Sequence, residues 1–329
     1  MRINKYGYIK KGKIEENMFS YNDNVKDKKL FVTISEEIKY NFNFLNAITG
    51  LMKTVENSNC EQVYVSASVK YTNFNKMGMA YLYNTLSFLA KKKTVFVESN
   101  LSKLIHERVT HSDGEKFKKI DLHEDINEKS VQQCYCFEGD RSINKTVQIL
   151  VDFIANKNLV LENAKEFLVT TIGEVFSNAF IHSDENKVFF MYDIEFHNEA
   201  FFLVINITDY GKTIIGNVQE FHNKVYGKKL SDKESVTWAM GNGHTTRSGS
   251  GGYGLPTLVD YVSKADGELL IFSGTCMYAL KGTNKSVLEA KGNFIGTSAS
   301  MKIPLFDTSK AIMYDEKTKQ LISVDLDEI

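Results

Sequence analysis

Between residues 163 and 182, apolar side chains recur every three or four positions, as on one face of a helix. They are Phe167, Leu168, Ile172, Val175, Phe176, Ala179 and Phe180. This spacing predicts an amphipathic helix over about 163–182. Glu174 and Asn178 are four positions apart, so they should be neighbours on one face of that helix.

Two runs rich in Phe, Val and Ile follow, over residues 187–196 and 200–208. Only three residues separate them, which predicts an antiparallel hairpin. The second run stops at Asp209, and Gly211 comes two positions later. An Asp at a strand end can direct its carboxylate into a cleft, and a nearby glycine lets ligand or backbone approach closely.

A glycine-rich turn, Gly249-x-Gly251-Gly252-x-Gly254, leads into a segment of helical spacing that starts at Leu255. Pro256 suits the first turn of a helix. Glycines before a helix expose backbone N–H groups at the positive end of its dipole, where phosphate can bind.

The N-terminal third alternates between strands, expected over 29–34, 62–66 and 94–97, and helices, expected over 42–55 and 77–90. Such alternation implies a small α/β sheet. The charged run at 111–129 is typical of a solvated loop or linker.

Taken alone, each polar motif has an ordinary explanation. Glu174 and Asn178 could be solvated helix surface, Asp209 a turn residue, and the glycines a flexible connector. A carboxylate beside an amide oxygen can also serve a Mg-phosphate site, because Asn offers a hard oxygen ligand and Glu can act as a base.

In their order along the chain, Glu174-Val175-Phe176-Ser177-Asn178, Asp209-x-Gly211 and the glycine-rich turn resemble the N, G1 and G2 boxes of the GHKL superfamily. These Bergerat-fold ATPases include histidine kinases, Hsp90, gyrase B, MutL and anti-sigma-factor kinases. The resemblance covers about residues 145–306. It implies a two-layer α/β sandwich with a mixed, largely antiparallel sheet.

The resemblance also implies a Mg-ATP site with a role for each matching residue. Asn178 would bind Mg²⁺, Glu174 would be the general base, and Asp209, supported by Gly211, would accept a hydrogen bond from the adenine amino group. Gly251, Gly252 and Gly254 would present N–H groups to the phosphates. Thr246 and Arg247 would lie where the lid meets the phosphate tail, and Leu255 would also belong to the nucleotide site. The chain departs from the family pattern at Thr213, where a second glycine is usual.

The segment at about 212–250 matches the ATP lid of that family. Its apolar residues interleave with charges, which predicts one or two short helices and a hinge near Gly243. Lid closure would exclude water and bring Arg247 to the γ-phosphate. A long surface loop is the alternative, although loops of this length tend to be functional.

Residues 60–97 resemble, in pattern only, a STAS-like domain, the fold of anti-sigma-factor antagonists. The antagonists carry a phosphorylatable Ser in a short turn, whereas this chain has Asn73-Phe74-Asn75 there. We therefore expect an interaction surface for an unidentified protein partner rather than a phosphoacceptor. The domains expected are STAS-like over 1–135, GHKL over 136–306, and an acidic, loosely held tail over 307–329.

Composition further limits the kind of protein that the chain can be. The chain has 329 residues, 43% hydrophobic, which suffices for two domains with real cores. A net charge of −1 gives no sign of a nucleic-acid or anionic membrane surface. No apolar run reaches the roughly 18 residues that span a bilayer, and the polar N-terminus does not look like a signal peptide. A cytoplasmic location is expected.

The cysteines and histidines add little. Cys134 and Cys136 fall on one side of a predicted strand, but no second pair completes a zinc site, so reduced thiols are expected. His106 faintly resembles a histidine-kinase phosphoacceptor but lacks the following Pro, which favours a surface histidine. The dipole of its helix alone explains His182.

Two classes of function follow. In the first, Mg-ATP binding and slow hydrolysis close the lid and switch a protein–protein interaction. In the second, the γ-phosphate goes to Ser, Thr or His of a partner protein, as in anti-sigma-factor or histidine kinases. ATPase or kinase activity, a scaffold without turnover, and a homodimer all stay open.

Overall fold

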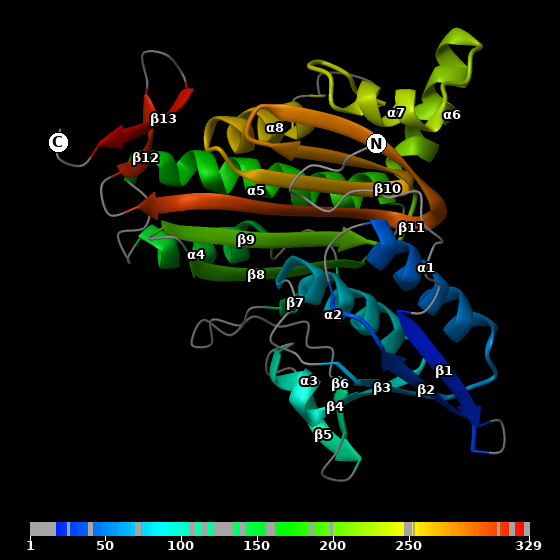
Figure 1. Ribbon diagram of the computed structural model, residues 1–329. Coiled ribbons are helices and arrows are strands. Elements are labelled where there is room, and N and C mark those ends of the chain that lie inside the picture. The colour runs from blue at the N-terminus through cyan, green and yellow to red at the C-terminus, as the bar shows by residue number, and fades with distance from the viewer. Residues whose placement is uncertain are drawn as a thin grey trace, which may run out of the picture.

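The computed structural model describes most of the chain, in segments separated by short gaps. The described residues are 18–24, 27–38, 42–69, 74, 76–104, 109–113, 117–120, 134–138, 143–155, 162–183, 187–197, 200–246, 252, 254–307, 310–315 and 320–325. They form two sheets, each with its own helices (Figure 1).

The first sheet has six strands in the order β1-β2-β3-β4-β6-β5. Its central pairings, β2 with β3 and β3 with β4, are parallel, and the outer pairings are antiparallel. Parallel neighbours need a crossover connection, which helices α1 (Phe42–Asn57) and α2 (Lys76–Ala90) provide. A short helix, α3 (Ser99–Leu104), follows β4. The strands are β1 (Phe19–Asn24), β2 (Lys29–Ile34), β3 (Gln62–Ala67), β4 (Thr94–Glu98), β5 (Val109–Asp113) and β6 (Phe117–Ile120).

The second sheet has seven strands in the order β13-β12-β11-β9-β8-β7, with β10 also paired to β11. Each of its pairings is antiparallel. The α/β class, with a small mixed sheet followed by a largely antiparallel one, is therefore confirmed. The strands are β7 (Cys134–Glu138), β8 (Lys187–His197), β9 (Ala200–Asp209), β10 (Glu268–Lys281), β11 (Asn284–Asp307), β12 (Lys310–Asp315) and β13 (Gln320–Asp325).

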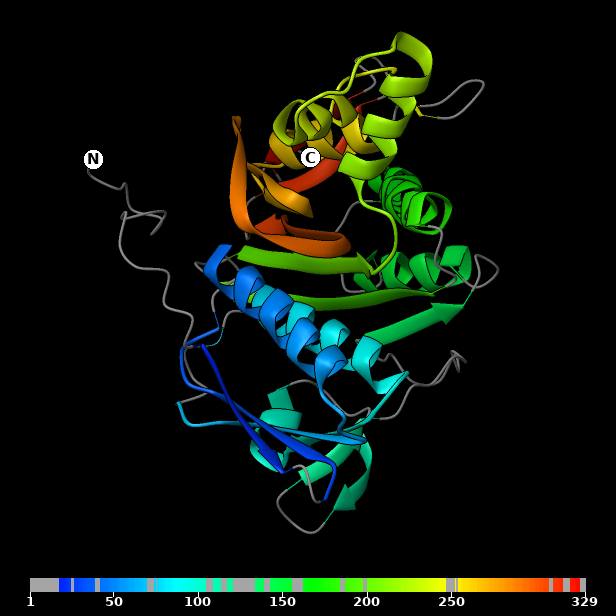
Figure 2. The same ribbon diagram turned by 90° about the vertical axis from the view of Figure 1, so that its right-hand side faces the viewer.

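Helices cover both faces of the second sheet, so the molecule has four layers (Figure 2). One face carries α4 (Ile143–Ala155), α5 (Glu162–Ser183) and α8 (Gly254–Lys264). The other face carries α1 and α2 of the N-terminal domain, which contact β11 and the β8–β9 pair respectively. Because side chains alternate along a strand, Phe190 packs in the core beneath α5 while Phe189 packs in the core beneath α2.

Two short helices, α6 (Ile214–Tyr226) and α7 (Asp232–Ala239), lie in the segment predicted to be a lid, and we call them the lid helices after that prediction. Thr213 caps α6, since its side chain accepts a hydrogen bond from the Gly216 N–H. Gly227 ends that helix in the left-handed conformation, and Ser231 with Glu234 forms a capping box on α7. These polar signals explain why helices interrupt the segment.

Two expectations need correction. The charged run at 111–129 contains residues of β5 and all of β6. β5 is the edge strand, where charge is tolerated, and β6 lies between β5 and β4. The acidic tail is also not loose throughout, since β12 and β13 form a hairpin there. The residues of Ile312-Met313-Tyr314 and Leu321-Ile322 favour strands, although acidic residues flank both runs. Strand β1 and helix α3 were not predicted.

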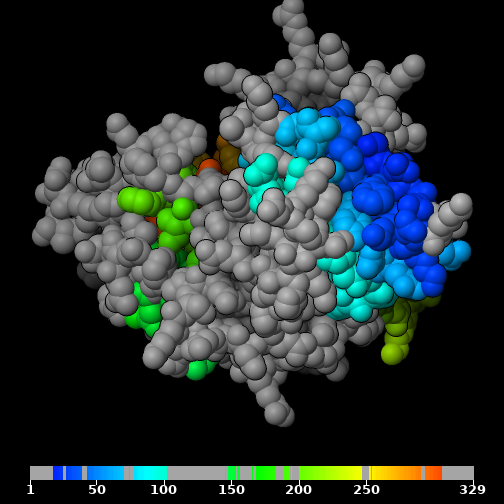
Figure 3. Space-filling view, turned by 90° about the horizontal axis from the view of Figure 1, so that it is seen from below, coloured from blue at the N-terminus to red at the C-terminus, as the bar shows by residue number. Residues whose placement is uncertain are grey.

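Seen from below, residues of the N-terminal domain adjoin one another on one side of the surface (Figure 3). Within the described ranges, no helix is both long and apolar enough to cross a membrane. Cys60 and Cys276 are buried free thiols. The side chains of Cys134 and Cys136 lie outside the described ones.

Candidate functional site

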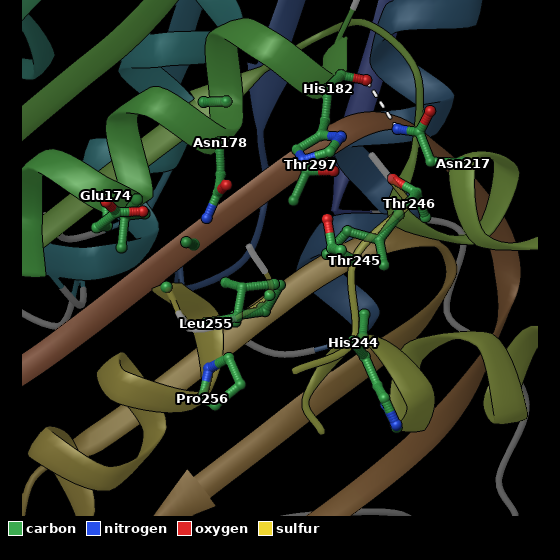
Figure 4. Close-up of a pocket in the computed structure, with 18 of the residues that line it drawn as sticks. Glu174, Asn178, His182, Asn217, His244, Thr245, Thr246, Leu255, Pro256 and Thr297 are labelled. Carbon is green, nitrogen blue, oxygen red and sulfur yellow. Dashed lines mark hydrogen bonds between the residues drawn. The ribbon is translucent and has the colours of Figure 1, made fainter. Parts of the chain in front are cut away.

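A cavity of about 460 Å³ lies between α5, the second sheet, the lid helices and the start of α8 (Figure 4). This volume falls within the range of small-molecule sites, roughly 300–1,000 Å³. The wall from the sheet is largely apolar, with Ile207, Ile271 and Ala299, and the other walls bring polar groups. A mostly apolar pocket with a few convergent polar groups is typical of a ligand site.

One face of α5 forms a wall of the cavity. Thr170, Glu174, Asn178 and His182 all line it, and each is four positions from the next. Four-residue spacing places side chains in a row along a helix, and Figure 4 shows the last three in that row. Thr171 also lines the cavity; its hydroxyl is buried and has no hydrogen-bond partner among the described residues.

Asp209 lies at the floor of the cavity, at the end of β9, where it is 3% exposed. The Gly211 N–H donates a 3.0 Å hydrogen bond to its Oδ1. Across the sheet, Thr297 is the strand partner of Asp209, and it lines the cavity as well. A buried carboxylate is costly unless it is hydrogen-bonded, so this group is well suited to accept bonds from a polar ligand edge.

The backbone conformation of Gly296 allows β11 to approach the end of β9 closely at Asp209. Its φ of +93° is in the region that favours glycine, and a Cβ there would lie 2.1 Å from the Asp209 carbonyl oxygen. β11 therefore passes directly against the end of β9. A larger residue at 296 would displace the floor of the cavity.

The start of α8 lies against the polar row of α5. A Cβ added to Gly254 would be 3.0 Å from both Asn178 Nδ2 and Glu174 Oε2. Gly252 has a φ of +84°, and its carbonyl accepts a 3.1 Å bond from the Gly243 N–H. The first N–H groups of a helix have no partner within it, so the α8 terminus offers donors and a positive dipole end to this part of the cavity.

The lid helices are held in place by bonds to the rest of the fold. Asn217 Nδ2 donates to the His182 carbonyl at 2.8 Å, and the Ile214 N–H donates to Ser273 Oγ at 2.7 Å. His244 stacks on Trp238 with ring centroids 4.7 Å apart and rings 7° from parallel. Both residues belong to the lining of the cavity.

Lys212 brings a positive charge to the cavity and is ion-paired with Glu220 of α6. The hydrogen bond from Lys212 lowers the pKa of the Glu220 carboxyl below its usual range. This pair therefore ties the start of the lid segment to α6 at neutral pH.

Most residues predicted from the sequence meet in this one cavity: Glu174, Asn178, Asp209, Thr246, Gly252, Gly254 and Leu255. Gly211 does not line it but supports Asp209 through its N–H. Arg247 and Gly251 lie outside the described residues.

Several lining residues were missed. His182 was attributed to the helix dipole, and Thr170 and Asn217 were not singled out at all. The four-residue spacing from Glu174 could have revealed Thr170 and His182. No local sequence pattern indicates that Thr297 and Trp238 line the cavity. Thr297 reaches it through the pairing of β11 with β9, and Trp238 through the packing of α7.

No family is shown for this chain. Neither a scan of protein-family models nor a search of curated proteins finds a match to it. Its architecture is a small N-terminal α/β domain followed by an antiparallel sheet with helices, and its site must be interpreted from geometry.

Proposed function

We propose that this chain is a Mg-ATP-binding regulatory protein of the GHKL type, in which a lid over residues 212–250 closes on the nucleotide and switches a protein–protein interaction. The observation that supports it most is the convergence of three separated motifs on one cavity. Glu174 and Asn178, then Asp209, then Gly252 and Gly254 all line it.

The floor of the cavity suits a nucleobase. Asp209 offers a buried carboxylate that can accept a hydrogen bond from an exocyclic amino group such as that of adenine. Two apolar residues line the cavity near it: Ile207, two positions earlier on β9, and Ala299 on the neighbouring strand β11. A purine ring would be held by these apolar contacts and oriented by the carboxylate.

The opposite part suits phosphates and a hard cation. The N-terminus of α8 supplies N–H donors, and close packing of Gly254 on α5 leaves room for no side chain there. Among the described residues, no three His, Cys, Asp or Glu side chains cluster to hold a metal by themselves. Mg²⁺ needs no such cluster, because it commonly binds one or two protein oxygens together with substrate phosphates.

Asn178 is the residue that would hold Mg²⁺, through its amide oxygen. Bound Mg²⁺ would supply charge neutralisation at the phosphates. Glu174, one turn away on the same row, would accept a proton from the attacking water or hydroxyl. The N-terminal STAS-like domain would present the surface that a protein partner reads.

The test is incubation with γ-labelled ATP and Mg²⁺, following label into free phosphate and into protein. Glu174→Gln should lower turnover by about 100-fold or more. Glu61→Gln is the matched control, since Glu61 pairs with Lys28 at the surface of the first sheet. Free phosphate that depends on Glu174 supports an ATPase switch.

Other outcomes redirect the proposal. Label on this protein, or on an added partner protein, would favour the kinase alternative. Binding without any turnover would favour a scaffold. An absence of nucleotide binding would overturn the proposal.

A further inference from the structure

The second sheet has the cavity on one face and the N-terminal domain on the other. Along β9, Ile207 and Asp209 line the cavity, whereas Asn206, Thr208 and the residue after the strand, Tyr210, are on the side of α2. On β11, the paired positions Thr297 and Ala299 line the cavity, and Ser298 and Ser300 lie on the opposite face. Strand alternation therefore places ligand-facing and domain-facing residues side by side.

Tyr210, the residue after Asp209, is anchored in the N-terminal domain. Its phenol donates a 2.9 Å hydrogen bond to Thr85 Oγ1 on α2, and Thr85 donates in turn to the Tyr81 carbonyl at 2.9 Å. Its ring stacks on Phe88 with centroids 4.1 Å apart, and meets Phe294 edge-on. Tyr210 is 4% exposed and Thr85 is fully buried.

A buried polar cluster extends this connection along β9. Asn84 of α2 donates to Asn206 Oδ1, and Asn206 donates to Ser298 and Ser300 of β11. Thr208 donates to Asn206 Oδ1 as well. All of these side chains are fully buried. A shift of α2 would therefore leave buried polar groups without their hydrogen-bond partners, which is costly.

The Asp209 main chain thus has little freedom. Tyr210 fixes it from the side of α2, β11 crowds it at Gly296, and its carboxylate is bonded to the Gly211 N–H. Because one peptide unit joins Asp209 to Tyr210, a shift of the phenol would rotate the carboxylate within the cavity.

We infer that Thr85 and Tyr210 are positioning residues for the ligand site: helix α2 of the N-terminal domain holds the Asp209 carboxylate in its binding orientation. The identity of the ligand rests on the proposed function. The contacts that join α2 to Tyr210 and Asp209 do not depend on it. This positioning has a reciprocal consequence, since linked sites affect each other equally. A ligand on Asp209 strengthens the docking of α2, and a partner that displaces α2 weakens ligand binding.

The first test needs no nucleotide. Amide exchange at Gly211, whose N–H donates to Asp209, is followed by NMR in Thr85→Val, Thr85→Ser and Tyr210→Phe. Exchange should speed up about threefold to tenfold in Thr85→Val and Tyr210→Phe, which lose the bond, and should stay near wild type in Thr85→Ser, which keeps the hydroxyl. Tyr64→Phe is the matched control, because it removes a phenol bond of 3.0 Å to Gln62 in the first sheet.

The second test measures Mg-ATP affinity of the same variants by calorimetry. Thr85→Val should bind about threefold to tenfold more weakly than wild type, and Thr85→Ser and Tyr64→Phe should bind within twofold. If Tyr210→Phe fails to fold, the comparison of Thr85→Val with Thr85→Ser still tests the positioning role.

The two tests separate the two claims. Unchanged Gly211 exchange in Thr85→Val overturns the positioning role whatever the ligand is. Faster exchange in a protein whose wild type binds no nucleotide keeps the positioning role and removes the proposed function. Equal loss in Tyr64→Phe and Thr85→Val would show a general loss of stability and overturn the inference.

Discussion

Asn217 on α6 donates a 2.8 Å hydrogen bond to the main-chain carbonyl of His182, near the C-terminal end of α5 (Figure 4). The last carbonyls of a helix have no partner within it, so the lid supplies one to the helix that carries Glu174 and Asn178. Both residues line the cavity. The bond is thus a latch between the lid and the proposed Mg-ATP site.

Removal of the latch should speed ligand release. Asn217→Leu loses one hydrogen bond, and we expect nucleotide to dissociate about threefold to tenfold faster. Trp238, the single tryptophan of the chain, lines the cavity and reports release by stopped-flow fluorescence. Asn223→Leu on the exposed face of α6 is the control. Equal dissociation rates in both variants would exclude the latch.

Gly254→Ala should block the site without unfolding the protein. An added Cβ would lie 3.0 Å from Asn178 Nδ2 and Glu174 Oε2, so these side chains must move. We expect affinity for Mg-ATP to fall about tenfold or more. Thermal unfolding checks the fold, and calorimetry checks the binding.

The control for that variant is Gly50→Ala on α1, where an added Cβ meets nothing within 4 Å. Alanine is a better helix former, so stability should rise by about 0.5–1 kcal/mol with no change in binding. If Gly254→Ala bound as tightly as Gly50→Ala, the contact of α8 with Glu174 and Asn178 would have no bearing on nucleotide binding.

Thr171→Val tests the buried hydroxyl that lines the cavity. Because that hydroxyl has no partner within the described part of the chain, valine should leave the unliganded stability unchanged or raise it by about 1 kcal/mol. Urea unfolding without nucleotide measures this. A loss greater than 1 kcal/mol would instead mean that the hydroxyl has a bonding role in the unliganded fold.

Stability should fall at alkaline pH. Burial raises the pKa of the Tyr261 phenol and of the Cys276 thiol, so the fold holds both groups neutral. Their contribution is complete below the unfolded pKa values, about 8.5 for Cys and 10 for Tyr, and is lost as pH rises beyond them. Urea unfolding from pH 7 to 11 should show the decline, and Tyr261→Phe should flatten it above about pH 10. An equal slope in that variant would contradict this assignment.

The sequence predicts elements where one periodicity dominates. Helix α5 follows from apolar spacing around Phe176, and the β8–β9 hairpin follows from runs of Phe, Val and Ile. Strand β6 was missed because its lysines look like a solvated loop, although it is paired on both sides, with β4 and with β5. The hairpin of β12 and β13 was missed because acidic residues flank it.

The site was predictable in its motifs but not in its pairings. Asp209 and Thr297 meet only through the register of β9 with β11, which no local pattern reveals. The docking of α2 on the sheet was hidden for a different reason. Asn84, Asn206 and Ser300 look like surface residues in the sequence, yet they are fully buried in a shared hydrogen-bond network.

The most direct measurement is calorimetric titration of Mg-ATP into the wild-type protein, into Asp209→Asn, and into Asp260→Asn as a control. Asp260 is on the exposed side of α8, paired with Lys264. The account predicts saturable binding to wild type and Asp260→Asn, and no measurable binding to Asp209→Asn, because an amide NH₂ would face the adenine amino group where an acceptor is needed. Unchanged affinity in Asp209→Asn, or no binding to wild type, would contradict it.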